Sequence, residues 1–177
     1  ALAGLLAWAE DVNQAGGLHL SESDSPRTVA VVHYDDASRP EQVRVLTQRL
    51  ILEDRVDLMM GPYSSVLAQA AASVTEQYGT VLWNQGGASD NIYQQGYRCV
   101  VGILTSASEY FYGLPQLLRE SRPEANSLAI VRAAIGSFPK GVSSGLERKA
   151  TEFGFKTVLL SEYDPAISDF SSIIDQI

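Results

Sequence analysis

The chain has 177 residues, of which 45% are hydrophobic and 19% are charged, as in an ordinary globular protein of one domain or two small lobes. Its formal net charge is −8, and its lysines and arginines are scattered, so nucleic acid is not expected as a partner. The single cysteine, Cys99, excludes an internal disulfide framework and a thiolate zinc cluster, and we interpret it as a buried, inert thiol.

The first predicted element is a helix that covers the start of the chain and ends near the glycines at positions 16 and 17, which tolerate a left-handed cap. The apolar residues at helical spacing are Leu2, Leu5, Leu6, Ala9 and Val12. The apolar start is too short to span a bilayer and lacks the basic residues of a signal peptide. Because no capping residue precedes this helix, we expect the sequence to be part of a longer chain.

Strands and helices alternate along the rest of the chain. Predicted strands begin near residues 28, 56, 80, 127 and 156. Predicted helices cover 41–54, 67–78, 109–121, 142–153 and the last residues from 169 onward. Strands in this order are typical of βαβ units, and their continuous apolar runs favour a parallel sheet covered on both faces. The fold class is therefore α/β, and ligands are expected beyond the carboxyl ends of the strands.

Two acidic residues, Asp35 and Asp36, follow the first predicted strand, as in phospho-accepting receiver domains. That chemistry also needs an aspartate at the end of a later strand. The next strands end at Met60 and at Asn84, so the acceptor is missing. We therefore predict that Asp35, Asp36 and Ser38 form a turn and cap the helix that follows.

The segment "GVSSG" at 141–145 matches the G-x-S-x-G pattern of a hydrolase nucleophile. That motif needs a tight turn directly from strand to helix, whereas residues 132–140 intervene here. Both histidines, His19 and His33, precede the serine, although such a hydrolase places its histidine after it. The segment is instead predicted to be a small-residue helix face packed on the sheet, and no acid, base and nucleophile set indicates an enzyme.

Two serines, Ser64 and Ser65, lie where an apolar strand ends and an alanine-rich helix begins. The free N–H groups and the dipole of a helix start favour an anion, so the hydroxyls either cap the helix or bind the same oxygen atoms. One βα unit later, a second loop of small residues follows the next strand: Gly86, Gly87, Ala88 and Ser89. It is either a flexible turn or a close approach of backbone to a ligand. Two such loops are suited to hold one small ligand from two sides.

Several segments together resemble a known family. They occur in the order "EDVNQAGG", "VVHYDDASRPEQV", "RLILEDRVDLMMGPYSSVLAQAAASVTEQYG", "GGASDNIYQQGY" and "DPAISDFSSIIDQI". The chain resembles the leucine/isoleucine/valine-type periplasmic solute-binding proteins of ABC importers. The resemblance covers nearly the whole chain and implies a type I periplasmic binding protein fold, in which two α/β lobes with parallel sheets clamp the ligand between them.

The resemblance also implies roles for individual residues. Ser65, with Ser64 beside it, is expected to hold the α-carboxylate of the ligand. The backbone and a hydroxyl of the loop at 86–89 are expected to meet the carboxylate and the amino group, with Ala88 or Ser89 in the hydroxyl position. Phe138 corresponds to an aromatic residue at the mouth of lobe two. Together with Tyr63 and Trp83, it suggests room for a flat or apolar ligand side chain.

The resemblance divides the chain into lobe one at 1–104, which lacks its first strand, and the first part of lobe two at 105–177. The second half of lobe two is expected outside this sequence. The implied partners are a small carboxylate such as an amino acid and an ABC transporter permease, and the expected location is periplasmic or extracellular, free or anchored to a membrane. No cofactor or metal is expected. A sensor or receptor ectodomain of the same fold is the alternative function. The missing first strand belongs between the strands at 28 and 56, so for the 177 residues alone we expect one of three outcomes: self-association that fills the gap with another copy's strand, collapse of the two neighbouring strands together, or a poorly ordered lobe.

Overall fold

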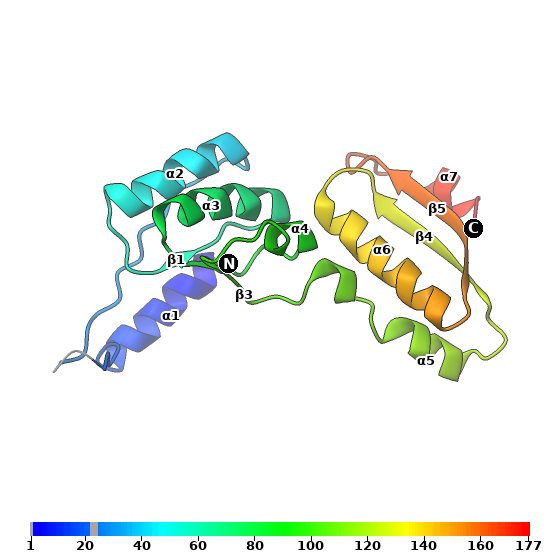
Figure 1. Cartoon of the computed structure of the whole chain (residues 1–177), viewed down its shortest axis with the longest axis horizontal. Helices are drawn as coiled ribbons and strands as arrows, with labels where there is room; N and C mark the ends of the chain where they lie inside the picture. The colour runs from blue at the N-terminus through cyan, green and yellow to red at the C-terminus, as the bar shows by residue number, and fades with distance from the viewer. Residues whose placement is uncertain (1, 22–24) are drawn as a thin grey trace.

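The structure, a computed structural model, describes residues 2–21 and 25–177. Its first group of elements is built around a parallel sheet with strand order β1-β2-β3. The bounds are α1 Leu2–Gln14, α2 Pro40–Leu52, β1 Met59–Met60, α3 Ser65–Tyr78, β2 Leu82–Asn84, α4 Asp90–Tyr93 and β3 Val100–Gly102. Figure 1 shows α2 and α3 lying together on one side of these strands and α1 on the other.

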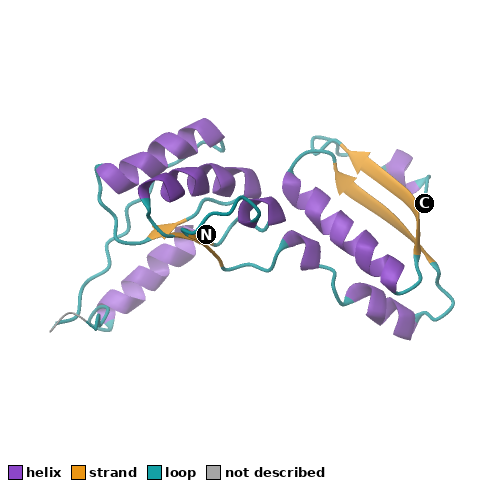
Figure 2. Cartoon of the chain, in the orientation of Figure 1, coloured by secondary structure: helices purple, strands orange, loops and turns teal. Residues whose placement is uncertain are grey.

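The second group of elements contains a separate parallel sheet of two longer strands. Its elements are η1 Ala107–Glu109, α5 Leu114–Ser121, β4 Ser127–Ala133, α6 Ser137–Glu152, β5 Lys156–Tyr163 and α7 Ser171–Ile174. Figure 2 shows α6 packed along one face of this sheet, and a single loop with η1 leading there from β3. The two sheets share no strand. The placement of the lobe boundary at residue 104 remains a prediction.

The core of the first group forms where α3 packs between α2 and the sheet. Its buried apolar residues are Val43, Met59, Leu67, Ala68, Ala70, Ala71, Ala72, Leu82 and Ile92. The row of alanines in α3 allows α2 and the strands to approach this helix closely, because each presents only a methyl group. The helix ends at Gly79, which adopts a left-handed conformation with φ 66°. This packing fixes the start of α3 at the carboxyl edge of the sheet.

The predicted strand at residues 28–34 is wrong. The segment carries no strand assignment, and the side chain of Val32 is 45% exposed. Its backbone is held instead by Asn13 of α1, whose side chain accepts from Val29 N at 2.7 Å and donates to Val29 O at 2.8 Å. The β-branched sequence favours an extended chain, but a strand also needs a neighbour that completes its ladder of hydrogen bonds. Among the described residues, none supplies that ladder.

The turn before α2 is confirmed, whereas the predicted helix cap is not. Asp35 accepts a hydrogen bond from Ala37 N at 2.8 Å, and Asp36 accepts one from Ser38 N at 2.7 Å. Both are aspartate turns of the kind that polar residues favour between elements. The cap residue is Arg39, which has no side-chain cap hydrogen bond. The two carboxylates bind the N–H groups of Ala37 and Ser38, which precede the helix, so they do not cap its first turn.

Two helix predictions are corrected in their details. The helix expected over 109–121 is broken into η1 and α5, with Pro115 in the first turn of α5. Proline is tolerated in a first turn but not in a helix interior, so a new helix has to begin there. The small-residue face of α6 packs only partly on the sheet. Ser143 Oγ meets Arg132 of β4 at 2.8 Å, whereas Gly145 faces the loop that contains η1.

Helix α3 is also joined to the start of β3 by the carboxylate of Glu76. One carboxylate oxygen accepts from Cys99 N and from Arg98 N, each at 2.9 Å. These hydrogen bonds, that of Cys99 first, lower the pKa of Glu76 below its ordinary value of 4.5. Because the folded-state pKa is lowered, the stabilisation is present above the ordinary value and is lost as the pH falls through the folded-state pKa.

We therefore expect Glu76→Gln to lower the melting temperature of the chain at neutral pH, because an amide is a weaker acceptor for the two N–H groups. The difference from the wild type should shrink as the pH falls through the folded-state pKa of Glu76. Thermal unfolding followed by circular dichroism at a series of pH values tests this. Glu41→Gln, on the exposed side of α2, is the matched control. An equal difference at every pH would show that charge plays no part.

No helix within the described residues is long and apolar enough to cross a membrane.

Candidate functional site

The first part of the candidate site is the start of α3, where Ser64 is the N-cap. Ser64 Oγ accepts a hydrogen bond from Leu67 N at 3.3 Å, so the capping interpretation of this serine is confirmed. The backbone of Ser64 has φ 128° and ψ 153°, a region that is essentially restricted to glycine. A conformation of this kind costs about 1–3 kcal/mol and is typical of functional sites. The sequence shows a capping serine, but not this strain.

The second part is the loop at 86–89, which leaves the carboxyl end of β2 and is shaped by Asn84. Asn84 is fully buried, and its Nδ2 donates to Gly87 O at 2.7 Å while its Oδ1 accepts from Gly87 N at 2.9 Å. One side-chain amide thus pairs with both polar groups of Gly87. A side chain at position 87 would lie 2.5 Å from the methyl group of Ala68, so glycine is required for the loop to rest on α3.

The two loops lie against each other and are joined by hydrogen bonds. Ser64 N donates to Gly86 O at 3.1 Å, and Ser89 N donates to Ser65 Oγ at 3.1 Å. Gln85 adds a third link, from its Nε2 to Gly61 O at 2.8 Å. At Gly86 the approach is so close that a Cβ would overlap Pro62 O. Both loops therefore meet at the carboxyl edge of the sheet, where open α/β sheets bind their ligands.

The joined loops leave polar groups without a protein partner. Among the described residues, no protein acceptor is found for the backbone N–H groups of Ser65, Val66 and Ala88. Ser65 and Ala88 are only 6% and 3% exposed, whereas Val66 is 48% exposed. The Ser65 hydroxyl accepts from Ser89 N and keeps its own proton for donation. Because buried N–H groups are nearly always paired, this cluster of donors is suited to a bound oxygen anion.

The aromatic residues of the predicted site lie in three different parts of the chain. Tyr63 belongs to the first loop, and its side chain is 77% exposed. Trp83 is in β2 and is 38% exposed. Phe138 lies in the first turn of α6, where its ring meets the edge of Tyr110 with 5.3 Å between ring centres. The roles assigned to Tyr63 and Phe138 remain predictions.

Sequence analysis missed two residues that shape the loop, Asn84 and Tyr93. The Tyr93 hydroxyl accepts from Asn84 Nδ2 at 3.0 Å and lies 3.3 Å from Gly87 O. Burial raises the pKa of Tyr93, and the hydrogen bond from Asn84 acts in the opposite direction. The signal in the sequence was a polar residue at the end of an apolar strand. We interpreted it only as the absence of an aspartate.

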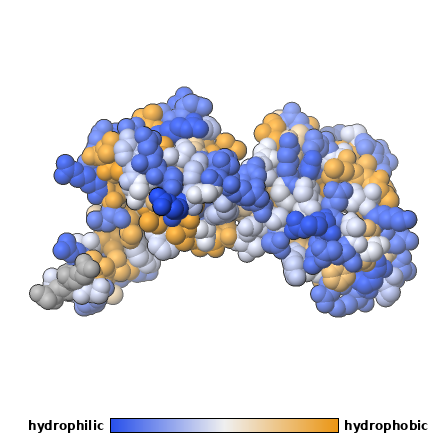
Figure 3. All heavy atoms as spheres, in the orientation of Figure 1, coloured by the Kyte–Doolittle hydropathy of each residue, from blue (hydrophilic) through white to orange (hydrophobic). Residues whose placement is uncertain are grey.

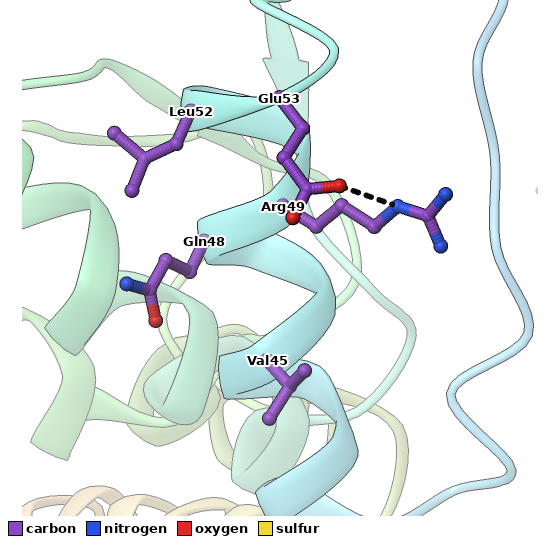
Figure 4. A pocket seen from close by; sticks show the side chains of 5 residues that line it. All are labelled: Val45, Gln48, Arg49, Leu52 and Glu53. Carbon is purple, nitrogen blue, oxygen red and sulfur yellow. Dashed lines mark ion pairs between the residues drawn. The ribbon is translucent and has the colours of Figure 1, made fainter.

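Two hollows of the surface are lined by other residues. One, of about 300 Å³, is lined by Leu104, Thr105, Glu109 and Tyr110. The other, of about 470 Å³, lies on the outer face of α2 and is shown in Figure 4. Its charged groups, Arg49 and Glu53, already pair with each other at 3.3 Å. Because its charges are paired, the hollow at α2 offers few groups to orient a ligand, so the donor cluster at the two loops is the better candidate.

Comparisons with known proteins agree with this architecture. A model of the periplasmic binding protein family matches residues 1–177. An amino acid binding protein of Pseudomonas aeruginosa is 20% identical over 176 residues, which cover 96% of this chain and 43% of that protein.

Two solved structures with the same fold contain different ligands. One is an ABC transporter substrate-binding protein of Desulfitobacterium hafniense in complex with leucine, with a TM-score of 0.79 and 22% identity. The match covers 98% of this chain and 49% of that one. The other is a solute-binding protein of Rhodopseudomonas palustris in complex with 3,4-dihydroxybenzoic acid, with a TM-score of 0.74 and 17% identity. The match covers 85% of this chain and 40% of that one. The chain thus spans less than half the length of these relatives. Because the family model matches every residue, the chain belongs to the periplasmic binding protein family.

Proposed function

We propose that this chain is the ligand-gripping part of an extracytoplasmic solute-binding protein that captures a small carboxylate, an amino acid or a related acid, for an ABC importer. The donor cluster at Ser65, Val66 and Ala88 supports this proposal most directly. It consists of N–H groups at a helix start and in an adjoining loop, which is the arrangement that favours an anion. The family membership supports a binding role without catalysis.

The ligands of the solved relatives support the carboxylate in particular. Leucine and 3,4-dihydroxybenzoic acid differ in size, shape and amino group, but both carry a carboxylate. A binding site made of backbone N–H groups and one serine hydroxyl recognises that shared carboxylate, while other parts of the pocket contact the rest of the ligand. We infer that Ser64, Ser65 and the loop at 86–89 hold the carboxylate, with Tyr63 and Phe138 beside the remainder of the ligand.

Partners and location follow from the same proposal. A solute-binding protein of this family acts outside the cytoplasm and delivers its ligand to the permease of an ABC transporter. The segment 28–34, which has no strand neighbour among the described residues, and the open edge of β1 add a partner of a different kind, a second copy of the chain, when the 177-residue polypeptide is studied by itself.

Titration of the ¹⁵N-labelled chain with leucine and with 4-hydroxybenzoate tests the proposed grip, since chemical-shift changes detect weak binding. We expect shifts at the N–H groups of Ser65, Val66 and Ala88. Leucinamide and 4-hydroxybenzamide, which lack the carboxylate, should leave these signals in place. Equal responses to acids and amides would contradict the proposal.

Ser65→Ala should weaken binding of the carboxylate. Removing a hydrogen bond to a charged group costs about 1.5–3 kcal/mol, or roughly a 10- to 150-fold rise in Kd. Ser73→Ala is the matched control, since Ser73 lies in the same helix and its hydroxyl bonds only Ala70 O. Both variants are titrated in the same way as the wild type. An unchanged Kd for Ser65→Ala would argue against the role assigned to its hydroxyl.

A further inference from the structure

The loop at 86–90 is hydrogen-bonded to the chain that leads to the second sheet. We call residues 103–113, between β3 and α5, the connection. Ile103 N donates to Asn84 O at 3.1 Å, and Ala107 N donates to Ala88 O at 2.7 Å. Ala88 and Ala107 are 3% and 0% exposed, so the second of these bonds is protected from water. The connection therefore does not leave the first sheet as a free linker.

The strongest link between loop and connection is made by Asp90, the first residue of α4. One carboxylate oxygen, Oδ1, accepts from Ser108 Oγ at 2.6 Å, and the other, Oδ2, accepts from Ser108 N at 3.1 Å. Two charge-assisted hydrogen bonds to one residue fix both its position and its orientation. Asp90 follows Ser89 directly, so the connection is anchored beside the candidate ligand loop.

On its other side, η1 rests against a glycine face of α6. Gly141 and Gly145 are one turn apart and therefore share a face of the helix. A Cβ at Gly145 would overlap the backbone of Ser108, and one at Gly141 would lie 3.0 Å from the Ala107 methyl group and 3.2 Å from Asp90 Oδ2. Glycine weakens a helix interior relative to alanine, so close contact with the connection is the physical reason for both glycines.

We propose that Asp90 is a positioning residue that, through Ser108 and the glycine face of α6, sets the orientation of the second sheet relative to the ligand loop while no ligand is bound. The contacts run from Ser89 to Asp90, then by hydrogen bonds to Ser108, and from the Ser108 backbone to Gly145. Figure 1 shows η1 and the near end of α6 beside α4, where these contacts occur. An effect of these contacts on ligand capture rests on the proposed function, whereas the contacts themselves can be tested without a ligand.

The test measures the orientation directly, by electron-spin distance measurements between labels on the two groups of elements. Cysteines replace the exposed residues Glu41 of α2 and Glu147 of α6, in a chain in which Cys99 is replaced by serine. We expect one narrow distance distribution for this parent when the labelled chain is diluted with excess unlabelled chain, which removes distances between labels on associated copies. Asp90→Ala and Gly145→Ala should each broaden or shift it, and Ser108→Ala, which removes a single hydrogen bond, should do so less.

Gly4→Ala is the matched control, because Gly4 is also inside a helix but has nothing within 4 Å of its Cβ position. It should leave the distribution unchanged. Circular dichroism shows which variants are folded, and if Gly145→Ala does not fold, Asp90→Ala and Ser108→Ala decide. A broad distribution in the parent, or an unchanged one in folded Asp90→Ala, would overturn the proposal. Because no ligand is added, this outcome is independent of the carboxylate titration.

Discussion

Replacing Asn84 with alanine is expected to destabilise the chain more than any other single change at the candidate site. The substitution leaves Gly87 N without a partner, and it removes one of the two hydrogen bonds made by Gly87 O and one of those made by the Tyr93 hydroxyl, at a fully buried side chain. A buried polar group left unpaired costs about 1–3 kcal/mol and each further hydrogen bond lost costs about 0.5–1.5 kcal/mol, so we expect a loss of about 2–6 kcal/mol. That is a large share of the stability of a typical domain, which is about 5–15 kcal/mol.

Urea unfolding followed by circular dichroism measures this loss. Asn91→Ala is the matched control, since Asn91 is an exposed asparagine seven residues further along the chain. It should change the unfolding midpoint little. Tyr93→Phe removes only the hydroxyl and should cost about 0.5–1.5 kcal/mol, the usual net value of one hydrogen bond. If Asn84→Ala were no more damaging than Asn91→Ala, the side chain of Asn84 would not be what shapes the loop.

The second large effect is expected in solution, where the 177-residue chain by itself should self-associate. Strand β1 pairs with β2 on one side only, and the extended segment 28–34 has no ladder among the described residues. Leu58 and Met60, beside this open edge, are 65% and 44% exposed. Figure 3 shows apolar surface on this side of the first group, between α1 and α3. An exposed, apolar strand edge is a template for pairing with another chain.

Sedimentation velocity over a range of concentrations tests this expectation. The wild type should form dimers or larger species as the concentration rises. Leu58→Lys should oppose it, because a charge at an edge disfavours strand pairing and the exposed position costs the monomer little. Lys replacing the equally exposed Val45, at the outer face of α2, is the control and should leave association unchanged. A wild type that remains a monomer at every concentration would show that the open edge does not drive pairing.

The sequence alone was sufficient for the α/β class, the family and the two loops that form the candidate site. The reason is local: apolar strands, helical spacing and the small residues after each strand are visible in short segments. Parallel strands also place their carboxyl ends at one edge, so the two loops were expected to lie on the same side of the sheet, and the structure joins them by a hydrogen bond from Ser89 N to Ser65 Oγ. The helix cap at Ser64 follows from the same local rules.

Only the tertiary structure decided which residues shape and connect those loops. Asn84 gains its role because its strand is buried and Gly87 folds back over it, and Asp90 gains its role because Ser108, 18 residues away, returns to it. Segment 28–34 has the composition of a strand but finds no neighbour to pair with among residues 2–21 and 25–177. Strand pairing and side-chain bonds of this kind join residues distant in sequence. Local propensity favours a strand, but the strand forms only where a neighbouring strand pairs with its backbone groups.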